Sequence, residues 1–125
     1  MANLASLIFT YSDNHSKMRK GVKVFTTAVI KELNSLLNTT FYIKDFYVEA
    51  NPVVDIEALI SNDKYELLIY VYAYPRETQV FLFNIMENAN TNCNLEFNLT
   101  DSPKDIAYNL LALISPEDIY AYTSK

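Results

Sequence analysis

Hydrophobic residues recur along this chain with two periods, one typical of helices and one typical of strands. Between residues 14 and 38 they fall three or four positions apart, which predicts one long amphipathic helix. The stripe consists of Met18, Val22, Phe25, Val29, Leu33 and Leu36. Before it, the apolar run from Leu4 to Tyr11 predicts a first strand.

Alternating patterns predict a series of strands after this helix. Residues 40–50 are rich in β-forming side chains, and a change of apolar parity after Ile43 predicts a bulge near Lys44 and Asp45. Residues 53–60 fit a strand or a short helix; we favour a strand because residues 61–64 would then form a hairpin turn. Residues 65–74, 79–86 and 95–99 predict three further strands, with an Asn-rich loop over residues 87–92.

A second helix is predicted near the end of the printed sequence. Ser102 is a suitable N-cap, Pro103 suits the first helical position, and the helix should run to about Ile114. A further start signal at Ser115 and Pro116 predicts a last short turn. The fold class is therefore α+β, one domain over residues 1–125. We expect a mainly antiparallel meander of about five or six strands, in the order strand, helix, five strands, helix.

Three tyrosines, Tyr70, Tyr72 and Tyr74, alternate along the clearest predicted strand and so share one face of it. We expect their neighbours on the next strand to be Val80, Leu82 and Met86. Because the opposite face is also apolar, either the last helix covers the tyrosines or a partner does. Tyrosine is enriched in protein interfaces. The predicted partner-binding residues are Glu66, Leu68, Tyr70, Tyr72, Tyr74 and Leu82.

The charge is divided unevenly along the chain. Residues 1–44 carry six Lys/Arg and two Asp/Glu, a net +4, whereas residues 45–125 carry four and 13, a net −9. If the predicted strand parities hold, Asp55, Glu57, Glu66 and Glu96 flank the tyrosine face. Tyrosines among carboxylates suit recognition of a basic protein; the alternative is an ordinary acidic surface.

Basic residues gather in the first turns of the long helix, where the helix dipole disfavours cations. The predicted anion-binding residues are Lys17, Arg19, Lys20 and Lys23; the alternative is a solvated helix face. Nucleic acid is not an expected partner, because four charges without interleaved aromatic residues are a weak signal.

The composition removes most residues with which enzymes work. The chain has one glycine, one histidine and one cysteine, too few for a phosphate-binding loop or a zinc site. His15 stands near Asp13, but no nucleophile is indicated. We therefore expect no catalytic residues, no metal and no cofactor, and not an enzyme. A lone cysteine, no signal-peptide pattern and no membrane-length apolar run favour a cytoplasmic location.

These features favour a small acidic cytoplasmic protein that inhibits or neutralises a protein partner by occluding its surface. A basic enzyme or a nucleic-acid-binding protein would be the target. An immunity protein or a phage-encoded anti-defence inhibitor would fit, and the Asn- and Tyr-rich composition is typical of AT-rich phages and mobile elements. One alternative is a homodimeric chaperone or a phage assembly protein. A second is a small-molecule-binding domain or enzyme with a cavity between sheet and helix.

Overall fold

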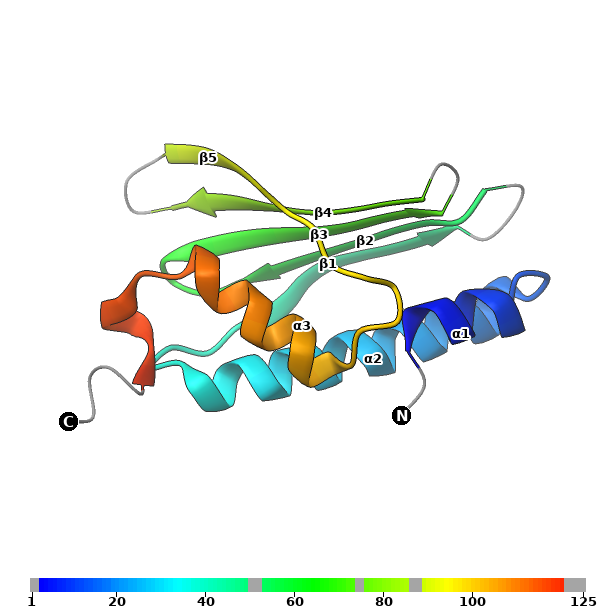
Figure 1. The fold of residues 1–125 in the computed structure, drawn as a ribbon, viewed down its shortest axis with the longest axis horizontal. Coiled ribbons are helices and arrows are strands. Elements are labelled where there is room, and N and C mark those ends of the chain that lie inside the picture. Colours follow the sequence, from blue (N-terminus) through cyan, green and yellow to red (C-terminus); the bar gives the residue numbers. More distant parts are fainter. Residues whose placement is uncertain (1–2, 50–52, 74–75, 86–88, 121–125) are drawn as a thin grey trace.

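A computed structural model describes residues 3–49, 53–73, 76–85 and 89–120. The chain folds into two layers, a five-stranded antiparallel sheet and three helices that lie on one of its faces (Figure 1). In the helical layer α1 and α3 lie beside α2, towards opposite ends of that long helix (Figure 1). The α+β class and the antiparallel meander are as predicted.

The first element is a helix, α1, spanning Leu4–Thr10, so the predicted strand over this segment is wrong. The side chain of Asn3 accepts a hydrogen bond from the backbone N–H of Ser6 at 2.8 Å, which caps the helix. Leu4 and Leu7, three residues apart, are the buried positions, whereas Phe9 is 87% exposed. A helical period is therefore hidden in what looks like a continuous apolar run.

The long helix α2, His15–Leu36, is confirmed, and its predicted stripe is buried from Met18 to Leu33, whereas Leu36 is half-buried. Asn14 caps it by accepting a hydrogen bond from the backbone N–H of Lys17 at 3.1 Å. After α2 the chain is held to the sheet by Asn34, whose amide pairs with both backbone groups of Phe41. This pairing fixes the turn from the helical layer into the first strand.

The strands follow one another in chain order across the sheet. They are β1 Tyr42–Glu49, β2 Asp55–Ser61, β3 Tyr65–Ala73, β4 Arg76–Asn84 and β5 Ala89–Leu95. The register shifts between Ile43 and Asp45, which confirms the predicted bulge, and the ambiguous segment is a strand. The strand β5 begins at Ala89, so the predicted Asn-rich loop is wrong from that residue onward. The strand predicted over residues 95–99 is also wrong, because β5 ends at Leu95.

The chain returns to the helical layer in α3, Pro103–Leu110. Ser102 caps α3 as predicted, accepting from the N–H of Asp105 at 3.1 Å, but the α-helix is shorter than expected and passes into 3-10 turns. An isolated bridge between Leu37 and Ile119 joins the end of α2 to the segment after α3. Two distant parts of the chain thus close one end of the helical layer.

The hydrophobic core lies between the helices and the inner face of the sheet. Its fully buried side chains come from both layers and include Met18, Val22, Leu33, Phe41, Ile60, Leu67, Val80 and Leu110. Tyr65 is the one polar-tipped member among the largest of them, and its hydroxyl lies 2.9 Å from the carboxylate of Asp118 and 3.0 Å from Ser115. The apolar stripes of the helices therefore pack against the inner face of the sheet.

Candidate functional site

The second face of the sheet carries no helix among the described residues (Figure 1). We call it the open face. In the register of β1 to β4 it consists of Asp45, Tyr47, Glu49, Asp55, Glu57, Leu59, Glu66, Leu68, Tyr70, Tyr72, Gln79, Phe81 and Phe83. The three helices α1, α2 and α3 cover the inner face, so none of them covers Tyr70 or Tyr72.

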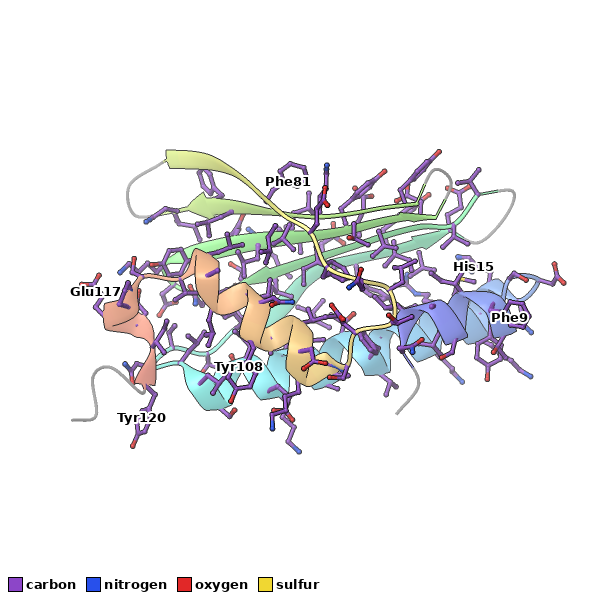
Figure 2. The ribbon with its side chains drawn as sticks, in the orientation of Figure 1. Phe9, His15, Phe81, Tyr108, Glu117 and Tyr120 are labelled. Atoms are coloured by element: carbon purple, nitrogen blue, oxygen red, sulfur yellow. The ribbon has the colours of Figure 1, made fainter. Side chains whose placement is uncertain are left out.

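One part of the open face is apolar and aromatic. Leu59 is paired with Leu68, and Leu68 is paired with Phe81, so three strands place apolar side chains side by side. The rings of Tyr70 and Tyr72 stack at 6.1 Å between centroids, with their planes 6° apart. Figure 2 shows Phe81 on β4, in the sheet layer away from α3. All of these side chains are half-buried, and together they form one broad surface.

The other part of the open face is acidic. Glu49 is opposite Asp55, and Asp55 is opposite Tyr72 on the next strand. Glu57 lies between Tyr47 and Tyr70 in the next row. The only described basic side chain paired with an open-face carboxylate is Lys44, which bonds Glu66 away from this cluster. The predicted placement of Asp55, Glu57 and Glu66 around the tyrosines is confirmed, whereas Glu96 lies past the end of β5 and outside this cluster.

Electrostatic repulsion and burial act together on these carboxylates. Burial, then the charge of Glu49, raises the pKa of Asp55, and one oxygen of Asp55 is buried without a hydrogen-bond partner among the described residues. Burial, then Asp55 and Asp45, raises the pKa of Glu57. A hydrogen bond to Glu49 raises the pKa of the Tyr47 hydroxyl. Among the residues that the structure describes, no basic side chain pairs with the carboxylates of this cluster, whose charges a nearby cation would favour.

Neutralising this cluster is expected to stabilise the fold at neutral pH. Because the folded-state pKa of Glu57 is raised, its ionised form is disfavoured in the folded protein, and stability is lost as the pH rises through that pKa. Glu57→Gln should raise the free energy of unfolding by up to about 0.5 kcal/mol after allowance for solvent screening. The gain should vanish below about pH 4, where the wild-type group is protonated.

Urea denaturation followed by circular dichroism at several pH values measures this effect. The control is Glu96→Gln, which removes one charge at an exposed position outside the cluster. Equal gains for both variants at neutral pH would show that overall charge, and not the cluster, is responsible.

Leu82 does not belong to the open face, which corrects one predicted partner-binding residue. Leu82 and Val80 pair with Leu67 and Ile69 on the inner face, where both are buried. Tyr74 and Met86 lie outside the described residues. Among the described members of the predicted set, the structure therefore brings together Glu66, Leu68, Tyr70 and Tyr72 on one face.

The sequence reasoning also missed residues that complete this face. Phe81 and Phe83 were expected opposite the tyrosines but share their face, because Ala73 pairs with Arg76 and only two residues separate β3 from β4. An odd loop length would have given the expected parity. Tyr47 and Glu49 of β1 also lie on the open face. The bulge that precedes them determines which face they occupy, and it could have indicated their position from the sequence.

The predicted anion-binding cluster divides into two parts. The guanidinium of Arg19 lies 5.1 Å from the ring centre of Phe46 and so covers the edge of β1. Lys17 and Lys20 line a groove between α1 and α2, and Lys23 lies beside it. Arg19 thus has a packing role, whereas the three lysines line two adjoining hollows that share Lys20.

Further features of the described part of the chain bear on catalysis, metal binding and ligand binding. His15 begins α2, and its ring bonds the backbone carbonyl of Val48, which ties the helix to β1 (Figure 2). Within the described ranges no group of three or more His, Cys, Asp or Glu residues is arranged to hold a metal ion, and no helix is long and apolar enough to cross a membrane. A cavity between sheet and helices, lined by residues such as Val22, Phe25 and Ile69, measures about 20 Å³. That volume leaves no room there for a small-molecule substrate.

Comparison of the chain with protein-family models, curated protein sequences and solved structures finds no match. The open face must therefore be interpreted from its own chemistry.

Proposed function

We propose that this protein binds a basic surface of another protein through the open face and blocks that surface by covering it. The observation that supports the proposal is the sheet face without a helix on it, where stacked tyrosines adjoin carboxylates that pair with no described basic side chain. Aromatic rings provide contact area at small entropic cost, and complementary charge speeds and orients association. An inhibitor of this type, such as an immunity protein or an anti-defence inhibitor, acts by occlusion and needs no catalytic residue.

The acidic cluster favours this function over a homodimer formed through the same face. A two-fold dimer brings the same surface of two copies together. The carboxylates of Asp55 and Glu57, already unfavourable in one copy, would then be desolvated against a second acidic surface. A Lys- or Arg-rich partner supplies the missing cation instead.

The test is to capture the partner and measure what binding does to it. The chain is immobilised, exposed to lysate of its source cells, and compared with a Tyr70→Ala/Tyr72→Ala chain. We expect a basic protein to be retained only by the wild type, to form an equimolar complex when purified, and to lose its own activity.

Two results would contradict the proposal. One is a captured protein whose binding is the same for both chains. The other is a dimer, seen by light scattering of the wild type at all concentrations and absent in the tyrosine variant, which would assign the open face to self-association.

A further inference from the structure

A groove of about 510 Å³ runs between α1 and α2, on the helical layer and apart from the open face. Its apolar lining is formed by Leu7, Tyr11, Gly21, Val24 and Phe25. A second hollow, lined by Lys20, Lys23, Val24 and Thr27, adjoins it along α2 and shares Lys20 and Val24 with it. No sheet residue lines it, so its occupant is independent of the open face.

The apolar floor of this groove follows from how the two helices approach. A Cβ at Gly21 would lie 2.7 Å from a terminal methyl of Leu7, so the lone glycine allows this close contact. Val24, one turn further along α2, is 60% exposed although it is aliphatic. An exposed valine beside a concave apolar floor is a typical anchor point for a partner's apolar side chain.

The rim of the groove is basic. Lys17, Lys20 and Lys23 stand three residues apart and so follow one side of α2, all three exposed. None of them has an ion-pair partner among the described residues, and the first turn of α2 holds no acidic residue to offset the positive helix end. Asp13, in the turn before α2, is a nearby exposed carboxylate.

We infer that this groove binds an acidic amphipathic segment of a protein partner. Apolar side chains of the segment pack on the exposed Val24 and the half-buried Tyr11, above the buried Leu7 and Phe25, and its Asp or Glu side chains meet the lysines. The concave shape favours an inserted segment over a membrane surface. Phe9 is the most exposed aromatic side chain described, and it lines a separate hollow on the other side of α1 (Figure 2). A membrane surface would be expected to contact this exposed ring rather than the groove.

Selection from a library of random short peptides displayed on phage tests this inference. The library is panned on the wild type after depletion on a Lys20→Glu/Lys23→Glu variant. We expect the recovered peptides to combine apolar residues with Asp and Glu. In fluorescence anisotropy, the recovered peptide should bind the lysine variant at least about tenfold more weakly.

Two control variants separate the groove from general effects. Lys31→Glu/Lys104→Glu makes the same change of net charge at exposed positions outside the groove and should bind the peptide as the wild type does. Val24→Asp should weaken peptide binding without unfolding the protein, since Val24 is exposed. Circular dichroism confirms the fold of each variant.

Three outcomes would overturn the inference. They are recovery of no peptides that depend on the lysines, recovery of basic peptides, and stronger lysine-dependent binding of phosphatidylserine vesicles or single-stranded DNA than of the peptide. Vesicle binding that is also lost in Phe9→Ala would assign this layer to a membrane instead.

Discussion

A Tyr70→Ala/Tyr72→Ala chain is expected to bind its protein partner at least about a hundredfold more weakly than the wild type. The two rings stack in parallel and lie between the apolar and the acidic parts of the open face. Tyrosines at the centre of an interface commonly account for most of the binding free energy. Neither ring belongs to the buried core, so the variant should remain folded. Isothermal titration calorimetry with the captured partner measures the loss.

The matched control for this experiment is Tyr108→Ala. Tyr108 is 51% exposed on α3, in the helical layer, so this variant removes a tyrosine from the other side of the molecule (Figure 2). Its binding constant should equal that of the wild type. A folded double variant with unchanged affinity would exclude the open face as the binding surface.

The second large effect is expected at Tyr65, whose replacement by alanine should lower the free energy of unfolding by about 3–5 kcal/mol. Tyr65 is the first residue of β3, and its side chain is 2% exposed and fills part of the core. Its hydroxyl bonds Asp118, and the same carboxylate is 2.9 Å from the ammonium of Lys64. Lys64 also pairs with Glu117 at 2.9 Å. Alanine therefore loses the packed ring and the hydroxyl's bonds to Asp118 and Ser115, whereas the two ion pairs of Lys64 remain.

Tyr65→Phe separates these two contributions. Phenylalanine keeps the ring but loses the hydroxyl, and the expected cost is about 1–3 kcal/mol. Tyr42→Phe, which removes the hydroxyl of a tyrosine that is 55% exposed, should cost nothing measurable. Urea denaturation measures all three. Equal stability of Tyr65→Phe and the wild type would show that the polar cluster around Asp118 does not stabilise the fold.

Patterns with one unambiguous period predicted their elements correctly. The stripe from Met18 to Leu33 predicted α2, because every member points at the sheet and is buried. Residues 4–10 were misassigned because Leu7, Ile8 and Phe9 are consecutive apolar residues, although only Leu7 is buried. The exposure of Phe9 depends on tertiary packing, which a short window of sequence does not contain.

The open face was predicted in part, and its errors have one geometric origin. Each strand's own alternation placed Leu68, Tyr70 and Tyr72 on one face correctly. Which side of β4 joins them depends on whether the hairpin loop has an even or odd number of residues. The expected strands, 65–74 and 79–86, leave a turn of four residues, whereas Ala73 pairs with Arg76 across a turn of two. Both lengths are even and both place Phe81 beside the tyrosines, so the assignment of Leu82 to that face did not follow from the expected turn. The groove between α1 and α2 could not be predicted, because the segment that forms α1 had been assigned to a strand.

The order of the elements has a consequence for how the chain completes its fold during synthesis. Residues 42–95 form the whole sheet from consecutive strands, so its pairing needs only neighbouring segments. The helical layer is instead divided between the two sides of that segment, with α1 and α2 before it and α3 after it. A nascent chain that has just finished β5 still exposes the inner-face residues that Ile106 and Leu110 will cover. We therefore expect the nascent chain to be prone to aggregation in the interval between the completion of β5 and the emergence of α3 from the ribosome.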